Sequence, residues 1–290
     1  MEAQLIIPAG ATLGEGPCWD EKKQVLYWID ILEKKIHRFK PVTNETQTIK
    51  LSQYIGCLGL VERGGYLVGL QDGIYYLDEI SEEIVSINHP ESEKKENRFN
   101  DGKVDPGGRF WAGTMHLDGL EGEGALYRLD IDKNISRMIE DVSISNGLAW
   151  DTNKQLMYYI DTPTKKVAAF DYDAATGEIN NKRYVITIPE GEGFPDGMTI
   201  DAEGMLWIAH WGGSRVSRWN PDNGEKLSEI FFPVSQVTCC CFGGEKLDKL
   251  YVTTASVGLS EAEQKEQPNA GGVFVVEPGV KGTYSYRFKG

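Results

Sequence analysis

Six segments of the chain repeat one pattern, in which a short apolar strand, a tight turn and a second apolar strand follow one another. They read PCWDEKKQVLYWID, LGLVERGGYLVGL, GKVDPGGRFWAGT, LAWDTNKQLMYYID, MTIDAEGMLWIAH and CCFGGEKLDKLYVTT. The apolar residue that opens each second strand recurs about every 45 residues, a period typical of repeat architectures. These residues are Leu26, Leu67, Phe110, Leu156, Leu206 and Leu250. Such a period limits the fold to an array of one small structural unit.

Each unit has room for about four short strands, because further strand-and-turn stretches such as SRVSRWNPDNGEKLSEI lie between the copies. Sustained helical periodicity is hard to find, and only SEAEQKEQ could form a turn or two of helix. Four strands repeated six times predict an all-β fold, a six-bladed β-propeller with four-stranded blades. An open β-sandwich or a solenoid explains six evenly spaced copies less simply.

We expect residues 1–290 to form a single propeller domain. The N-terminal stretch AQLIIPA is strand-like and precedes the first copy, so we expect it to pair with the last blade and close the ring. Hairpin turns begin at Asp20, Asp105, Asp151 and Asp201. An aspartate side chain in such a place can accept a hydrogen bond from the backbone two residues on.

The first strand of each propeller blade lines the central channel, so residues in the same phase of the repeat face one another. Counting back ten residues from the repeat positions, or eleven in the first copy, where the turn is longer, gives one residue per blade. They are Glu15, Cys57, Asn100, Asn146, Asp196 and Cys240. Four of the six carry oxygen donors. Asp196, although it stands in a turn-like Pro-Asp-Gly, is therefore predicted to lie on a channel strand.

The four oxygen-bearing residues of this ring predict a cation site. A glycine follows each of them at once or one residue later, which lets the backbone bend and approach a ligand closely. Two carboxylates that converge without a basic partner repel one another, and a bound cation removes that cost. All-oxygen donors suit Ca2+, Mg2+ or Mn2+, while Zn2+ and Fe2+ stay open. Alone, each motif is typical of a turn; the shared phase favours the metal.

The two cysteines of the ring are open to two interpretations. Cys57 and Cys240 could be ligands, but we favour small buried side chains that fill a narrow channel. In TCCCF, strand alternation predicts that Cys240 points inward and its neighbours point to the other face. His116 and His210 could reach the channel mouth, although neither has metal-ligand spacing. Five cysteines without a CxxC pair indicate reduced thiols rather than disulfides.

Charge and composition exclude several classes of function. The net charge of −14 repels polyanions, so we expect no nucleic-acid partner. With no signal peptide and no apolar run long enough to cross a bilayer, we expect a cytoplasmic protein without a membrane partner, a monomer or weak homo-oligomer. GxSxG, HExxH, Walker and GxGxxG signatures are missing from the sequence, so a nucleophilic serine is not indicated.

From LGEGPCWD to AGGVF the chain resembles the gluconolactonase/regucalcin family, also called senescence marker protein-like sugar lactonases. NRFNDGKVDPGGRFWAGTM, ISNGLAW, FPDGMTIDAEGMLWIA, TCCCFGG and LYVTTA carry the resemblance, and LSEAEQKEQPNAGGVF is most similar to the bacterial sugar-lactonase branch. The resemblance implies one divalent cation held by Glu15, Asn146 and Asp196, with Asp196 also the catalytic acid/base. It implies that Arg98 and Asn100 bind substrate; by itself, Arg98 could be an ordinary surface arginine.

Some members of the family have a further substrate-contacting acidic residue after the GTM strand. Asp118, in GTMHLDGLEGEG, is the nearest match here, and the segment departs from the family pattern. The glycines of residues 116–124 would suit a mobile lid over the mouth. The implied function is a metal-dependent hydrolase that opens sugar lactones to aldonic acids in carbohydrate metabolism. A non-catalytic calcium-binding regulatory propeller and a hydrolase for aryl esters or organophosphates are the alternatives.

Overall fold

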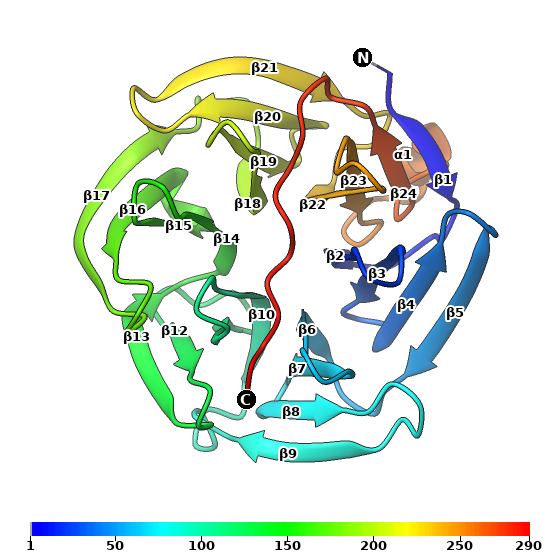
Figure 1. Cartoon of the computed structure of the whole chain (residues 1–290). Coiled ribbons are helices and arrows are strands. Elements are labelled where there is room, and N and C mark those ends of the chain that lie inside the picture. The colour runs from blue at the N-terminus through cyan, green and yellow to red at the C-terminus, as the bar shows by residue number, and fades with distance from the viewer. Residues whose placement is uncertain (1) are drawn as a thin grey trace.

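A computed structural model of the chain describes residues 2–290 as six four-stranded antiparallel sheets arranged around a central axis (Figure 1). The predicted six-bladed propeller is confirmed. Blade 1 contains β2 (Gly14–Asp20), β3 (Val25–Asp30), β4 (Lys35–Lys40) and β5 (Glu45–Lys50), and blade 2 contains β6 (Ile55–Leu60), β7 (Tyr66–Leu70), β8 (Ile74–Leu77) and β9 (Ile84–Asn88). Blade 3 contains β10 (Asn97–Val104), β11 (Phe110–His116), β12 (Gly124–Leu129) and β13 (Ile135–Val142).

The other three blades continue around the axis in chain order. Blade 4 contains β14 (Ser145–Asp151), β15 (Leu156–Asp161), β16 (Lys166–Tyr172) and β17 (Ile179–Thr187), and blade 5 contains β18 (Phe194–Ile200), β19 (Leu206–Trp211), β20 (Arg215–Asn220) and β21 (Glu225–Phe231). Blade 6 contains β22 (Val237–Gly243), β23 (Lys249–Thr254), β24 (Val273–Val276) and, from the other end of the chain, β1 (Gln4–Ile7). Antiparallel pairing of β1 with β24 confirms that the N-terminal strand closes the ring.

Apolar side chains fill the space between neighbouring blades. Each of six buried clusters joins one pair of neighbours, so every interface around the ring has its own core. In the cluster between blades 5 and 6, for example, Trp207 and Ala209 pack with Val252 and Phe274. Burial of apolar surface at every interface is therefore what holds the ring together.

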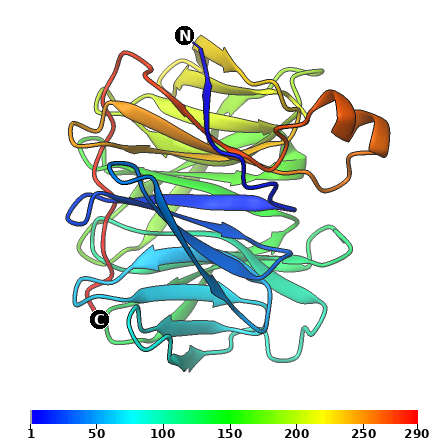
Figure 2. The same cartoon turned by 90° about the vertical axis from the view of Figure 1, so that its right-hand side faces the viewer.

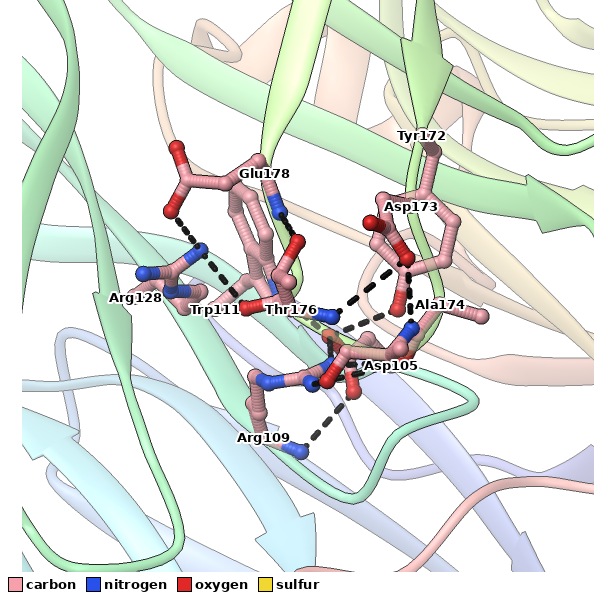
Figure 3. A network of polar contacts seen from close by, with 10 residues as sticks. Asp105, Arg109, Trp111, Arg128, Tyr172, Asp173, Ala174, Thr176 and Glu178 are labelled. Carbon is pink, nitrogen blue, oxygen red and sulfur yellow. Dashed lines mark hydrogen bonds and ion pairs between the residues drawn. The ribbon is translucent and has the colours of Figure 1, made fainter.

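The hairpin aspartates bond their own turns, as the sequence predicts. Asp20, Asp151 and Asp201 each accept a hydrogen bond of 2.9 Å from the backbone N–H two residues on. Asp105 instead accepts from the N–H of Arg109, four residues on, at 2.8 Å. Its other oxygen accepts from the Trp111 indole and from the Tyr172 hydroxyl of blade 4 (Figure 3). This aspartate therefore ties two blades together as well as closing a turn.

The two faces of the propeller differ. The C-terminal segment, residues 277–290, crosses the axis on one face (Figure 1), and helix α1 (Glu261–Glu266) projects on the opposite side (Figure 2). Beneath the crossing segment lies a cavity of about 70 Å3, lined by residues 283–286 and by all six innermost strands. The channel is therefore covered at this end. Within residues 2–290, none of the helices has the length and apolarity needed to cross a membrane.

Candidate metal centre and active site

Every innermost strand changes register with its neighbour near its first residues. The irregularities fall between Glu15 and Cys18, Ile55 and Cys57, Phe99 and Gly102, Asn146 and Leu148, Pro195 and Met198, and Val237 and Cys239. A β-bulge bends its strand and re-aims the side chains around it. The four predicted oxygen donors all lie at such a bulge, at the same end of the channel.

Glycines at the bulges allow the innermost strands to approach one another. A Cβ built on Gly147 would lie 2.8 Å from the carbonyl oxygen of Asp196, and one on Gly197 would overlap the Cys239 side chain. The sequence predicts that these glycines make room for a ligand. The contacts show instead that they make room for the neighbouring blade, which brings the polar side chains of adjacent blades close together.

The structure brings five of the predicted site residues into one buried cluster. Glu15, Arg98, Asn100, Asn146 and Asp196 are all buried, and the two acids are each 6% exposed. Arg98 Nη1 donates to Asn100 Oδ1 at 2.7 Å, and Asn100 Nδ2 donates to Asn146 Oδ1 at 3.2 Å. Glu15 lies close enough to Asp196 for its negative charge to raise the pKa of the Asp196 carboxyl group. Residues from blades 1, 3, 4 and 5 thus meet near the axis.

Burial and mutual repulsion dominate the electrostatics of this cluster. Burial, and then the negative charge of Asp101, raise the pKa of Glu15 to about 8. Burial and the charges of Glu15 and Asp101 raise the pKa of Asp196 well above its ordinary value. Burial lowers the pKa of Arg98 to about 10, opposed by the charge of Glu15. The arginine does not neutralise the acids, so the cluster favours a further positive charge.

Asp101 also belongs to the site, although the phase of the repeat does not identify it. It is buried beside Asn100, and its Oδ1 accepts a 2.7 Å hydrogen bond from the N–H of Gly102. Burial raises the pKa of its carboxyl group as well. The sequence did carry a signal, because glycine follows Asn100 one residue later than it follows the other ring residues. The register shift of β10 lies between Phe99 and Gly102 and contains Asp101, at the place where β14 and β18 have Gly147 and Gly197.

The chemistry of the donors fits a hard divalent cation. Within residues 2–290, no group of three or more His, Cys, Asp or Glu side chains is arranged to hold a metal ion. A cation would therefore use an amide oxygen together with carboxylates. Asn146 Oδ1 accepts a hydrogen bond within the buried polar cluster, and the carboxyl groups of Glu15 and Asp196 interact electrostatically there. An all-oxygen set of this kind suits Ca2+, Mg2+ or Mn2+.

The predicted role of the ring cysteines is wrong. Cys57 packs in the core between blades 2 and 3, and Cys240 packs in the core between blades 5 and 6, with its Sγ 3.6 Å from the Trp207 carbonyl oxygen. Cys239 and Cys241 line the axial cavity instead. The reason is register: Leu250 pairs with Phe242, eight residues back, whereas Leu156 pairs with Asp151, five residues back. Counting back ten residues from the repeat position therefore reaches different points along the innermost strand in different blades.

Asp118 and the two histidines stand apart from the buried cluster. Asp118 is exposed in the loop after β11, whereas the five cluster residues are buried; its backbone N–H donates to His116 Nδ1 at 3.1 Å. His210 is fully buried, with Nδ1 bonded to the Glu192 carbonyl oxygen at 2.8 Å and Nε2 to the Ser217 hydroxyl at 2.6 Å. Both ring nitrogens of His210 are used within the protein, so neither is free to bind a ligand.

Comparison with known proteins gives consistent matches along the whole chain. Residues 13–256 match the model of the SMP-30/Gluconolactonase/LRE-like region. A Bacillus subtilis protein provisionally named sugar lactone lactonase YvrE is 40% identical over 290 residues, which is 100% of this chain and 99% of the relative. Human regucalcin is 38% identical over 296 residues, with the same two shares covered. The structure of an Agrobacterium tumefaciens regucalcin, described as a calcium-binding protein, superposes with a TM-score of 0.95 at 27% identity, covering 99% of this chain and 97% of that one.

Proposed function

The chain belongs to the SMP-30/gluconolactonase/LRE-like family, and from this premise we propose that it is a metal-dependent lactonase that opens sugar lactones, such as glucono-lactones, to aldonic acids. The observation that carries the proposal is the buried cluster that contains Glu15 and Asp196 together with Asn146 and Arg98. The cluster has a base, donors for a developing charge and a place for a cation. These are the parts that water-dependent opening of an ester ring requires.

The proposed ligands of the cation are Glu15, Asn146 and Asp196, each from the innermost strand of a different blade. A bound divalent cation supplies Lewis-acid polarisation of the lactone carbonyl group. The three side chains would hold the cation, and through it the lactone carbonyl group, near the axis, where burial limits the access of bulk water. A variant that lacks any one of these side chains would hold the cation with only two of the three ligands.

Asp196 is the proposed acid/base. Its carboxylate takes a proton from the attacking water as the water oxygen bonds to the carbonyl carbon. The bond between that carbon and the ring oxygen then breaks, and the same carboxyl group returns the proton to the departing oxygen. The products are a carboxylic acid and a free hydroxyl group on one open-chain sugar acid. Atoms and charge balance with water as the only co-reactant.

Arg98 and Asn100 are the proposed substrate-binding residues. Arg98 uses Nη1 for its hydrogen bonds within the protein, which it donates to the Phe99 carbonyl oxygen at 2.9 Å and to Asn100 Oδ1 at 2.7 Å. Within residues 2–290, its Nε and Nη2 groups donate to no protein acceptor. They are therefore free to hold sugar hydroxyls or the oxygen on which negative charge develops.

A non-catalytic calcium-binding regulatory role is the second candidate. It is favoured by the several relatives named regucalcin, one of whose structures is described as that of a calcium-binding protein. The same three ligands would hold calcium in either case. The difference between the two functions lies in turnover, not in the site.

The test is acidification of weakly buffered glucono-δ-lactone above its spontaneous rate. Protein purified without chelators is expected to be active, to lose activity with EDTA and to regain it with Ca2+, Mn2+ or Zn2+. Asp196→Ala is expected to abolish hydrolysis. A chain that binds a cation but never exceeds the spontaneous rate, on this lactone or on a panel of others, would support the regulatory role instead.

A further inference from the structure

The hydroxyl group of Thr162 bridges two blades directly behind the proposed metal ligands. Thr162 begins the single-turn 3-10 helix η1 (Thr162–Thr164), which connects β15 to β16, and it is 9% exposed. Its Oγ1 lies 2.8 Å from Asn146 Nδ2 and 2.8 Å from the carbonyl oxygen of Pro195. Asp196 follows Pro195 in the chain. One hydroxyl group therefore contacts one ligand side chain and the backbone next to another.

The direction of these hydrogen bonds is fixed by proton counting. A carbonyl oxygen can only accept, so the single proton of the Thr162 hydroxyl goes to Pro195. The hydroxyl oxygen must then accept from Asn146, and only the NH2 end of that amide can donate. The Asn146 carbonyl oxygen is consequently turned to the other side, toward the polar cluster on the axis.

The hydrogen bonds at the other end of this chain fix the same orientation of the Asn146 amide independently. Arg98 can only donate, so its partner on Asn100 is the amide oxygen. Asn100 Nδ2 then donates both to the carbonyl oxygen of Ser145, at 2.8 Å, and to Asn146 Oδ1. The sequence Arg98, Asn100, Asn146, Thr162 and Pro195 thus runs from an obligate donor to an obligate acceptor. Neither amide can flip without leaving buried groups unpaired.

We propose that Thr162 is a positioning residue, which holds the amide of Asn146 with its oxygen toward the cation and fixes the backbone that carries Asp196. This inference rests on the proposed function, because it assigns Thr162 a role toward the same cation. Partners of this kind orient metal ligands, and their loss typically weakens metal binding roughly 10–100-fold. Without the hydroxyl group, the NH2 end of Asn146 has no buried acceptor, and only the 3.2 Å hydrogen bond from Asn100 still favours this orientation of the amide.

The experiment compares three variants by calorimetric titration of chelator-stripped protein with Ca2+ and with Mn2+. Thr162→Val keeps the shape of the side chain but removes the hydroxyl group, and is expected to bind either ion about 10–100-fold more weakly. Thr162→Ser restores the hydroxyl group and should bind within about threefold of the unaltered chain. Thr164→Val is the matched control in the same turn, where the exposed hydroxyl donates to the Asp161 carbonyl oxygen and accepts from the Lys166 N–H. It should leave affinity unchanged.

Melting temperatures of the metal-free variants separate positioning from general stability. If Thr162→Val lowers the melting temperature while the affinity for both ions stays that of the unaltered chain, the residue is structural and the inference is overturned. If the unaltered chain binds neither ion, the proposed function fails together with it. Should the valine variant not fold, Thr162→Ala removes the same hydroxyl group without placing a methyl group against Pro195.

Discussion

Burial gives Asp196 and Glu15 their chemistry. Both carboxyl groups lie where water barely reaches them, and the negative charge of Glu15 raises the pKa of Asp196. Such a pair is stable only when its members share a proton or when a cation lies between them. The same arrangement that destabilises the empty site therefore prepares it to bind a divalent ion.

Asp196→Asn tests this trade-off. The substitution keeps the size of the side chain and removes one of two repelling charges, so the metal-free protein should gain stability, by on the order of 1 kcal/mol. Lactone hydrolysis should fall by roughly a thousandfold or more, because no acid/base remains. Urea unfolding and acidification assays measure the two effects. Asp118→Asn, on an exposed loop, is the control; if it is as inactive as Asp196→Asn, the acid/base assignment loses its specificity.

His210 gives the folded protein a predictable sensitivity to acid. Burial lowers its pKa to about 4 from an ordinary value of 6.5. The unfolded chain therefore binds a proton at this position at a higher pH than the folded chain does, and stability falls as pH drops from about 6.5 towards 4. His37 acts in the same direction, because burial lowers its pKa to about 4 as well.

The comparison that isolates His210 is His210→Asn, measured against the unaltered chain. The asparagine NH2 group can still donate to Glu192, but it does not titrate. Between pH 7 and pH 5 the unaltered chain should lose about 2 kcal/mol more than the variant. Urea unfolding at both pH values gives the difference. Parallel losses in the two proteins would mean that His210 is not held neutral.

At the scale of the element, the innermost strand was the most predictable part of the molecule. The apolar anchors Leu206 and Phe110 do open second strands, and Glu15 and Asp196 do lie on channel strands, because hydrophobic alternation and turn chemistry are local. The prediction failed for Cys240, where a bulge and an unequal hairpin change the phase. Bulge positions depend on how neighbouring blades pack, which no single strand encodes.

Thr162 was missed for a related reason. It stands in a connection between the second and third strands of blade 4, sixteen residues from Asn146 and far from the ring phase. Its role depends on blade 5, whose Pro195 carbonyl oxygen accepts its proton. A repeat pattern identifies equivalent positions in different blades, but it does not identify contacts between unequal positions of adjacent blades.

The Asp105 junction should matter for stability and not for the site (Figure 3). Asp105→Ala leaves the Trp111 indole and the Tyr172 hydroxyl without their acceptor and takes the carboxylate away from the buried Arg109 guanidinium, and should cost about 3–5 kcal/mol. Asp173→Ala, in an exposed turn nearby, should cost no more than about 1 kcal/mol. Urea unfolding compares the two. Metal affinity per folded molecule should be unchanged in both; a loss confined to Asp105→Ala would link this junction to the site.

At the scale of the whole molecule, the ring is only as stable as its closure. Six cores in a closed circle leave no blade with an uncovered face, and β1 covers the edge of β24 that would otherwise be open. We propose that the whole chain therefore behaves as one domain. The cation site needs this closure, because its ligands come from blades on different sides of the axis.

Deletion of residues 2–7 tests the closure. The full chain should unfold in one cooperative transition, because each blade depends on two neighbours. The shortened chain should melt at a lower temperature and should self-associate, since an open strand edge pairs readily with other chains. Differential scanning calorimetry and light scattering measure both properties. Two separate transitions in the full chain, or an unaffected shortened chain, would contradict the single-domain account.

The most direct test of the central claim is a crystal structure of the protein soaked with Mn2+, with the ion located by its anomalous scattering. We predict one ion per chain, within coordination distance of Glu15, Asn146 and Asp196, and no ion there in Glu15→Gln crystals treated in the same way. An ion bound only elsewhere, or none on the axis at a concentration that supports lactone hydrolysis, would contradict the claim.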